Sequence, residues 1–567
     1  MPLETSEQEK TREQRPTMAG EARAVNFRRN ELESRSFLVV DDFGDMRSMV
    51  KNMLQSMGVQ QIDLARNGVE AIRAIENPDN HYQVILCDYN LGPGKNGQQI
   101  LEEVRHRELI GVGTVFVMIT AENTFEMVMG AVEYEPDSYM TKPFTKDLLR
   151  SRLEKLIARK KDLEDVERAM TRRDFEGAIR LLDAKIGTRP RNLAQLNKLK
   201  GELALRAGDH ERAEQVYREV LEGRDLPWAR LGLGKVYYAS GRYQEAQALF
   251  QQLLEQNPRL TAAYDWLART QQALDALPAA QQTLEQAVSL SPKAILRQRA
   301  LGELALKNDD LEVAERAFAE AVSLGRHSVY KTPRTYADLA RIRVRTRGAK
   351  EARKVLQGLQ REFPGDTEAS LHAAMADSAI AMAQGDEATA RARLAEARAL
   401  YRGMGDDAGA ELTLELARTC GALGETERAK ELLQQAVRNN HAEEAFLREV
   451  GSALGDLGLG IDPEAFISDI RREIIRLNNE GVQLARAGRL DQAVGLFEEA
   501  VKRMPGNKVV NLNTARVLIM YMKRHGPDEE NLRRVRELLA RVKGLDPESQ
   551  SLRKVHGMLR ELLESAA

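Results

Sequence analysis

The sequence has few of the residues that mark a disulfide-stabilised, zinc-binding or membrane-spanning protein. Its 567 residues include two cysteines, Cys87 and Cys420, and eight scattered histidines with no Cys/His cluster at zinc spacing. Because two cysteines make no disulfide framework, we expect a reducing compartment, the cytoplasm. No apolar stretch approaches the roughly 20 residues of a membrane-spanning helix, and the N-terminus lacks the apolar core of a secretory signal.

Aromatic residues and net charge are also scarce. Aromatic side chains make up 5% of the chain, and 30% charged residues leave a formal net charge of only −2. This balance does not favour nucleic acid or an anionic membrane as the main partner. The sequence also lacks a phosphate-cradling Gly-rich loop with lysine, a GxSxG motif and a helix-turn-helix with a basic recognition helix. A DNA-binding regulator, or an enzyme acting on external substrates, is therefore disfavoured.

What the sequence does contain is an alternation of strand and helix signals between residue 36 and about residue 160. The apolar run 84–87 is typical of a strand buried on both faces of a parallel sheet. Further strands are expected at 37–40, 62–65, 115–119 and 138–140, and amphipathic helices at 46–57, 68–75, 97–106, 125–132 and from 146 onwards. This order predicts an α/β fold, a doubly wound five-stranded parallel sheet with all strand carboxyl ends on one edge.

Polar side chains follow these strands at the edge where open α/β sheets bind ligands. Asp41 and Asp42 follow the first strand, Asp88 the third, Thr120 the fourth and Lys142 the fifth. Two like charges ~4 Å apart repel by on the order of 4 kcal/mol at an effective dielectric of ~20, and Mg²⁺ would remove that cost. An aspartate in such a site can act as a nucleophile toward a phosphoryl group, with lysine and threonine binding the phosphoryl oxygens.

Each of these features also has a purely structural interpretation. Asp41 and Asp42 could cap the following helix, and Lys142-Pro143 could form a turn. Cys87 is expected to be a small core residue. We favour a functional pocket because all these residues fall at matching strand ends.

Four segments resemble the receiver domain of bacterial two-component response regulators, most closely the CheY-like chemotaxis type. They are Phe37-Leu38-Val39-Val40-Asp41-Asp42-Phe43, Cys87-Asp88-Tyr89-Asn90, Met118-Ile119-Thr120-Ala121 and Tyr139-Met140-Thr141-Lys142-Pro143-Phe144. The resemblance spans about residues 36–157. It implies that Asp88 accepts a phosphoryl group from a sensor histidine kinase or phosphotransfer protein. It also implies that Asp42, Asp88 and the Asn90 carbonyl bind Mg²⁺, with Asp41 helping through water.

The same resemblance implies a conformational switch. Thr120 would move toward the phosphoryl group and the Tyr139 ring would turn inward, which would rearrange the surface of the family's fourth helix, fifth strand and fifth helix. The loop 91–97 is one residue longer than the usual family loop and richer in glycine, which puts kinase recognition or phosphoryl lifetime in doubt. Asn90 and Glu122 fall where side chains influence attack by water, so we expect self-catalysed dephosphorylation.

After residue 160 the strand signals stop and a 34-residue period begins. With Pro227 as position 1, small residues at positions 8 and 20 let two helices approach, a bulky residue at 24 fills the space between units, and proline at 32 ends the second helix. The matching residues of this unit are Gly234, Tyr237, Gly241, Ala246, Phe250 and Pro258. Such units resemble tetratricopeptide (TPR) repeats over most of residues 165–547, which predicts an all-α superhelical solenoid.

Two irregularities interrupt the repeats. The interval from Ala314 to Ala352 is 38 residues, so a longer connection is expected at 325–333. Between residues 440 and 473 the pattern lapses, and Asp462-Pro463 is typical of an N-cap followed by a helix-starting proline. We place a hinge or sub-domain boundary near 458–462.

The concave groove of a TPR solenoid offers a surface for a peptide or partner helix. Positions 2, 5, 9, 12 and 13 should face that groove, and the candidates are Lys198, Trp228, Lys235, Tyr238, Arg269 and Arg299. Each could equally lie on a solvated helix face, and Trp228 could cover the seam between two repeats.

These observations predict a flexible charged tail at 1–34, a receiver at 35–157, TPR-like repeats at 158–457, and further repeats with a capping helix at 458–567. We expect a phosphorylation-controlled response regulator with Mg²⁺ as cofactor, whose solenoid binds a protein and which catalyses only its own phosphorylation and dephosphorylation. Because 146–170 has few helix breakers, the last receiver helix should continue into the first repeat as a rigid lever. The alternative is a phosphorylation-independent scaffold that uses the receiver for docking or homodimerisation.

Overall fold

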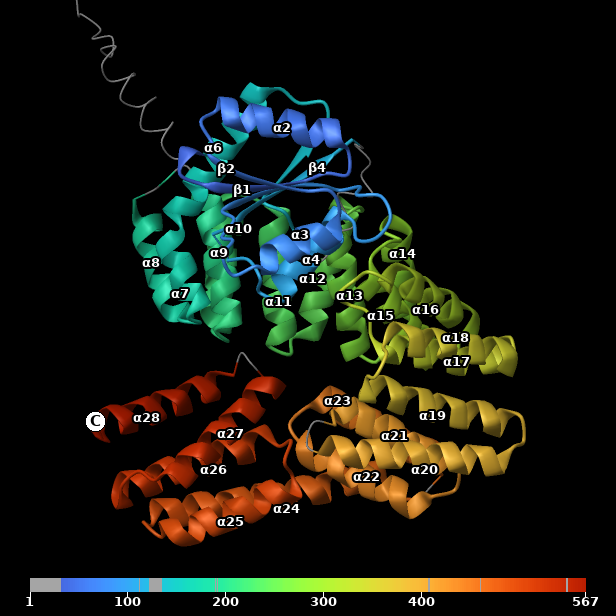
Figure 1. Cartoon of the computed structure of the whole chain (residues 1–567). Helices are drawn as coiled ribbons and strands as arrows, with labels where there is room; N and C mark the ends of the chain where they lie inside the picture. Colours follow the sequence, from blue (N-terminus) through green and yellow to red (C-terminus); the bar gives the residue numbers. More distant parts are fainter. Residues whose placement is uncertain are drawn as a thin grey trace, which may run out of the picture.

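The computed structural model describes residues 32–111, 113–121, 135–188, 190, 192–405, 408–458, 460–546 and 549–566 (Figure 1). Most of the predicted tail at 1–34, the predicted helix at 125–132 and Glu122 lie outside the described residues. Among the described helices, none is both long enough and apolar enough to cross a membrane.

The first part of the chain is the predicted five-stranded parallel sheet, and its strands lie in the order β2-β1-β3-β4-β5. Its strands lie within one residue of the predicted bounds: β1 Ser36–Val40, β2 Gln61–Ala65, β3 Val84–Asp88, β4 Val115–Thr120 and β5 Ser138–Thr141. In this register Val40 lies beside Cys87, and Asp88 lies beside Ile119. The acids that follow β1 are therefore brought next to the acid that ends β3.

Helices cover both faces of this sheet (Figure 1). Helices α2 (Gly44–Ser56) and α6 (Lys146–Asp162) lie on one face, and α3 (Gly68–Glu76) and α4 (Gly97–His106) lie on the other. Strand β3 is buried along its whole length because its residues alternate between the two cores, Leu86 facing α2 and α6 and Ile85 facing α3 and α4. Cys87 is a buried free thiol in the second core, as expected.

The rest of the described chain is helical, and consecutive helices pack in pairs. The pairs of the first half are α7 Glu164–Thr171 with α8 Phe175–Gly187, α9 Leu193–Arg206 with α10 His210–Gly223, α11 Pro227–Ala239 with α12 Tyr243–Gln256, α13 Thr261–Ala273 with α14 Leu277–Leu290, α15 Ile295–Lys307 with α16 Leu311–Gly325, and α17 Pro333–Thr346 with α18 Ala349–Glu362. The remaining helices are α19 Thr367–Ala383, α20 Glu387–Met404, α21 Ala410–Ala422, α22 Thr426–Asn439, α23 Glu444–Asp456, α24 Pro463–Arg486, α25 Leu490–Arg503, α26 Lys508–His525, α27 Glu529–Leu545 and α28 Gln550–Ala566.

The small residues at position 8 of the repeat are explained by close packing against the bulky residue at position 24. A Cβ atom added to Gly234 would lie 2.4 Å from Cε1 of Phe250, and one added to Gly481 would lie 2.5 Å from the Phe497 ring. Real Cβ atoms do not approach other atoms so closely, so these two helix pairs can pack at this distance only because glycine stands at position 8. This packing agrees with the repeat inferred from the spacing.

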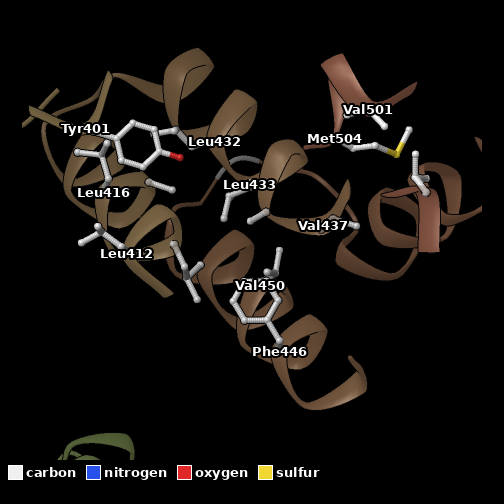
Figure 2. Close-up of a cluster of buried hydrophobic side chains, with 14 of the residues drawn as sticks. Tyr401, Leu412, Leu416, Leu432, Leu433, Val437, Phe446, Val450, Val501 and Met504 are labelled. Carbon is white, nitrogen blue, oxygen red and sulfur yellow. The ribbon is translucent and has the colours of Figure 1, made fainter. Parts of the chain in front are cut away.

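Both irregularities of the repeat have structural counterparts. Helix α16 ends at Gly325 and α17 begins at Pro333, which gives the longer connection that was expected. Asp462 caps α24 by accepting hydrogen bonds from the backbone N–H groups of Glu464 and Ala465. Figure 2 shows a cluster of buried side chains that runs from Val437 and Phe446 across this region to Met504. The domain boundary at 457/458 stays a prediction.

The predicted unbroken helix from residue 146 to residue 170 is wrong. Helix α6 ends at Asp162, Leu163 takes φ −105° and ψ 6°, and α7 begins at Glu164. Basic side chains close α6 and acidic side chains open α7, namely Arg159, Lys160 and Lys161, then Glu164, Asp165 and Glu167. Cations stabilise a helix C-terminus and anions an N-terminus, so this charge order favours two helices rather than one lever.

Candidate functional site

Three carboxylates meet at the carboxyl edge of the sheet. One oxygen each from Asp41, Asp42 and Asp88 lies within 4.8 Å of the others, with Asp41 and Asp88 buried and Asp42 exposed. The Lys142 Nζ atom lies 2.7 Å from Asp41 Oδ2 and 2.7 Å from Asp88 Oδ2. The cluster faces a cavity of about 420 Å³ that Asn90 also lines. The structure thus brings together the five polar residues expected around the pocket that follow β1, β3 and β5.

The backbone around Asp41 does not support the alternative of a helix cap. Asp41 Oδ1 accepts a hydrogen bond from the Phe43 N–H at 2.9 Å, and its carbonyl accepts one from Arg47 at 2.5 Å. The N-cap residue of α2 is Phe43, and no side chain caps this helix by a hydrogen bond. Asp41 therefore fixes the turn after β1, while its second carboxylate oxygen points to Lys142.

The position of Lys142 follows from the pairing of the last two strands. Its backbone N–H donates to the Thr120 carbonyl at 2.8 Å, so the lysine continues the β4–β5 ladder beyond Thr141. The chain bends at Lys142 and Pro143, and the lysine side chain reaches both buried aspartates. The turn and the pocket are thus compatible.

Burial and charge act in opposite directions on the two ends of this ion pair. Burial raises the pKa of Asp88 above its usual range, and the hydrogen bond and charge of Lys142 oppose that rise. For Lys142, burial lowers the pKa, but the hydrogen bonds to Asp41 and Asp88 outweigh it and the pKa is raised. The lysine is therefore held as a cation between the two carboxylates.

The loop 91–97 after Asp88 is anchored at its end by glycine. Gly92 and Gly94 have positive φ angles of 68° and 113°. A Cβ atom on Gly97 would lie 2.2 Å from the Asp88 carbonyl oxygen, so only glycine lets α4 begin this close to the end of β3. Asn96 and Gln99 form a capping box at the start of the helix.

The two residues of the predicted switch lie on the adjacent strands β4 and β5. Thr120 is buried at the end of β4. The Tyr139 hydroxyl is buried and has no hydrogen-bond partner among the described residues, and burial raises its pKa to about 12. The side chain as a whole is half-buried, and its movement stays a prediction.

The donor set suits a hard divalent cation. Receiver domains bind Mg²⁺ through an acidic pocket, and Asp41, Asp42 and Asp88 form such a group here. Carboxylate and carbonyl oxygens are the ligands that Mg²⁺ prefers, and the exposed Asp42 leaves the cluster open to solvent.

Of the six groove residues predicted from the repeat, three gather around one side chain that the sequence reasoning missed. Lys235 and Tyr238 on α11 and Arg269 on α13 surround Trp266. The sequence could have indicated this residue, because Trp266 is one of two tryptophans in the chain and lies one helical turn before Arg269.

The other three candidates have other contacts, although the charge of Lys198 reaches Lys235 and lowers its pKa. Trp228 packs edge-on against Tyr217 at 6.3 Å between ring centroids, which matches the alternative that it covers a seam between repeats. Lys198 pairs with Glu202 on its own helix at 3.9 Å. Arg299 lies on α15, where its charge acts on Glu303.

Fold and site together define a receiver domain joined to a helical-repeat solenoid. A family model for the response regulator receiver domain matches residues 37–154, and tetratricopeptide repeat models match residues 165–226, 204–270 and 238–304. Over 122 residues the chain is 34% identical to chemotaxis protein CheY-3 of Vibrio cholerae, covering 22% of this chain and 91% of that protein. It is 31% identical to chemotaxis protein CheY of Pseudomonas aeruginosa, covering 22% and 95%.

Solved structures show likenesses to the two parts. The receiver domain of the Francisella response regulator 1452 is 27% identical and covers 22% of this chain and 98% of that one, with a TM-score of 0.20. A tetratricopeptide repeat protein from Parabacteroides merdae is 16% identical and covers 46% and 98%, with a TM-score of 0.30.

The chain belongs to the response regulator receiver family, through a CheY-like domain that is followed by tetratricopeptide repeats. Neither the receiver nor the repeat is a family of enzymes.

Proposed function

We propose that this protein is a phosphorylation-controlled response regulator in which Asp88 accepts the phosphoryl group and the solenoid binds a partner protein. One observation carries the proposal: Lys142 Nζ lies 2.7 Å from both Asp41 and Asp88, next to the open carboxylate of Asp42. Mere docking has no need of a partly buried cation between two buried acids, because desolvating these charges is costly.

The chemistry follows from the roles of the individual side chains. An oxygen of Asp88 attacks the phosphorus of a phosphohistidine, an O–P bond forms as the P–N bond breaks, and the imidazole nitrogen keeps the electron pair. Lys142 then pairs with the phosphoryl oxygens and the Thr120 hydroxyl donates a hydrogen bond to them. Asp41, Asp42, Asp88 and the Asn90 carbonyl would hold Mg²⁺, which would offset the negative charge of the incoming group.

The donor of the phosphoryl group would be a sensor histidine kinase or a phosphotransfer protein. Attack by water on the aspartyl phosphate, at the side of the pocket that Asn90 lines, would return Asp88 to its carboxylate. Phosphorylation would be read through Thr120, at the end of β4, and Tyr139, within the adjacent strand β5.

A signal from the pocket has a short route to the solenoid through the two unusual loops of the chain. The Gln99 Nε2 atom lies 3.5 Å from the carbonyl oxygen of Leu324, in the last turn of α16 just before the lengthened connection to α17. Gln99 Oε1 accepts from the backbone N–H of Asn96, the residue that closes the lengthened loop after Asp88. Nearby, His106 packs edge-on against Tyr330 at 5.8 Å between centroids. A change in loop 91–96 would therefore reach the solenoid through one side chain.

A second attachment lies where α6 meets α7. Asp137, just before β5, is approached by Arg105, Arg159 and Lys160 at 3.7, 3.3 and 3.2 Å, and Lys160 also approaches Glu167 of α7 at 3.7 Å. These ion pairs tie the first repeat to the receiver in place of the rigid lever. Two separate attachments are what a receiver needs if its movement is to change the solenoid.

The proposal is tested with acetyl phosphate and Mg²⁺ as the phosphoryl source. Intact-mass analysis should show one added phosphoryl group on the wild type and on Asp63→Asn, a matched acid on β2, and none on Asp88→Asn. Amide hydrogen exchange of residues 324–333 should change on phosphorylation of the wild type. Gln99→Ala should still be phosphorylated and should lose that change.

The outcomes distinguish a phosphorylation-controlled receiver from one that serves only for docking or dimerisation. Phosphorylation of Asp88→Asn would contradict the assignment of the acceptor. Phosphorylation of the wild type with unchanged exchange throughout the solenoid would instead identify the receiver as a docking or dimerisation module.

A further inference from the structure

One tryptophan of the solenoid carries two cations and a second aromatic ring. The Lys235 Nζ atom lies 5.4 Å from the Trp266 ring centroid, and the Arg269 guanidinium carbon lies 4.9 Å from it. The Tyr238 ring meets Trp266 edge-on at 5.4 Å between centroids. Lys235 and Arg269 both stand at position 9 of consecutive repeats, which places them on the first helices of their pairs, the helices that line the groove.

A third cation comes from a helix much later in the chain, α23. Arg448 on α23 donates to the Ala273 carbonyl at the end of α13, at 3.4 Å. The Tyr238 pKa is raised by burial, and the charges of Arg269 and Arg448 partly oppose this rise, so both cations lie near the tyrosine hydroxyl. Three cations thus converge on one pair of aromatic rings.

None of these three cations forms an ion pair with a carboxylate of the described residues. Two cations of the neighbouring helix α15 do form ion pairs, with carboxylates of α13 and α23. Arg297 binds Asp265 through two contacts of 2.8 Å, and Lys307 binds Glu449 at 2.8 Å. Holding a partly buried lysine without an ion pair is unfavourable. Burial lowers the pKa of Lys235, the charges of Lys198 and Arg269 lower it further, and the charges of Glu202 and Glu135 oppose that fall without reversing it. The three cations therefore converge on the two rings without an ion pair of their own, although the charges of Glu202 and Glu135 reach Lys235.

We propose that the cluster of Lys235, Tyr238, Trp266, Arg269 and Arg448 binds an acidic segment of the partner protein. Carboxylates of that segment would pair with the three cations, and an apolar side chain beside them would pack on the two rings. This inference rests on the proposed role of the solenoid as a protein-binding output, and it gives that partner a chemistry. Nucleic acid fits less well, because three cations make no extended basic stripe and the chain carries a net charge of −2.

The receiver places a carboxylate of its own near this cluster. Glu135 lies close enough to Lys235 to raise its pKa, against the larger effect of burial. The same residue raises the pKa of Tyr139, four positions further along the chain. An acidic segment on the cluster would therefore lie beside the receiver, so a shift of Glu135 on phosphorylation would change the charge that the segment meets.

The test uses the full chain and the fluorescence of Trp266. Because the protein has only two tryptophans, Trp228→Phe leaves Trp266 as the sole reporter. A short synthetic peptide rich in Asp and Glu should change this fluorescence, and the same peptide with Asn and Gln should not. Lys235→Gln with Arg269→Gln should weaken binding of the acidic peptide by about tenfold or more, as expected for the loss of charge-assisted contacts.

Two further variants control for a general loss of positive charge and for misfolding of the groove. Arg212→Gln removes a cation that pairs with Glu176 between α10 and α8, and it should leave binding unchanged. Lys235→Arg keeps the charge and should retain binding, whereas a misfolded groove would not. Equal binding of the acidic peptide to the wild type and the double variant would overturn the proposal, as would tighter binding of a single-stranded oligonucleotide than of the peptide.

The peptide experiment and the phosphorylation experiment fail independently. Peptide binding is measured on unphosphorylated Asp88→Asn protein, so it does not depend on the pocket. Loss of peptide binding with normal phosphorylation of the wild type would remove this inference alone. Normal peptide binding without phosphorylation of Asp88 would remove the proposed receiver function alone.

Discussion

Replacing Lys142 with methionine tests the electrostatics of the pocket most directly. Methionine keeps much of the volume of the side chain but removes the cation that holds Asp41 and Asp88 together. Their side chains are only 4% and 9% exposed, so solvent screens them poorly. We therefore expect the variant to be destabilised in the receiver and not in the solenoid.

The size of the effect follows from the separation of the carboxylates. Oxygens within 4.8 Å of each other repel by about 3.5 kcal/mol at an effective dielectric of ~20. A loss of this size increases the population of opened molecules roughly 300-fold. Amide hydrogen exchange of β1 and β3 should accelerate by that factor, because these buried strands exchange only when the sheet opens.

Two conditions should restore protection in the Lys142→Met variant. Added Mg²⁺ should slow the exchange, since the three acids would bind it and lose their mutual repulsion. Lowering the pH should also slow it: the pKa of Asp88 is raised in the folded state, so between the unfolded and folded values the native state binds more protons, and protonation removes one charge.

Arg73→Met, which removes an exposed cation from α3 of the same domain, is the matched control and should exchange as the wild type does. Unchanged exchange of β1 and β3 in Lys142→Met at neutral pH without Mg²⁺ would refute the electrostatic account of the pocket. Faster exchange that Mg²⁺ does not reverse would instead indicate lost packing.

Three further predictions concern the solenoid. Gly234→Ala should destabilise α11 and α12 by about 1–3 kcal/mol, because its Cβ would lie 2.4 Å from Phe250; faster exchange in these helices, relieved by Phe250→Leu, is the readout. Asp265→Ala should cost about 3–5 kcal/mol by leaving the buried Arg297 without its partner; adding Arg297→Met should restore protection in α15, and no recovery would count against an electrostatic cause. His372 has a pKa lowered to about 3 by burial and two nearby arginines, so the unfolded chain binds more protons between pH 6.5 and 3. The free energy of unfolding should therefore decrease as the pH is lowered through this range, by up to ~1.4 kcal/mol per pH unit. His372→Gln should flatten that slope in urea unfolding.

The receiver could be predicted from sequence almost completely because its information is local. Apolar runs such as 84–87 define buried strands, and short connections force all strand carboxyl ends to one edge. That constraint places Asp41, Asp88 and Lys142 at one edge, and the strand order then brings them together. The repeats were equally visible, because each glycine at position 8 is required by one contact inside its own unit.

The end of α6 shows where local information was present but misjudged. The absence of helix breakers near residue 163 suggested a continuous helix, while the run of basic and then acidic residues favoured two helices. The ion pairs of Asp137 with Lys160, and of Lys160 with Glu167, also hold the second helix against the receiver. Terminal charges and tertiary contacts together outweighed helix propensity.

Contacts between distant repeats were decided only by the tertiary structure. Arg553 on α28 donates to the Arg173 carbonyl at 2.9 Å and lies 5.1 Å from the centroid of the Phe175 ring, so the last helix meets the first pair (Figure 1). Arg448 reaches the end of α13 in the same way. The sequence determined the strands, the pocket and each helix pair, because their contacts are close along the chain or fixed by strand order. It did not determine the cation cluster on Trp266 or the meeting of the two ends, because small rotations between repeats add up over the whole solenoid.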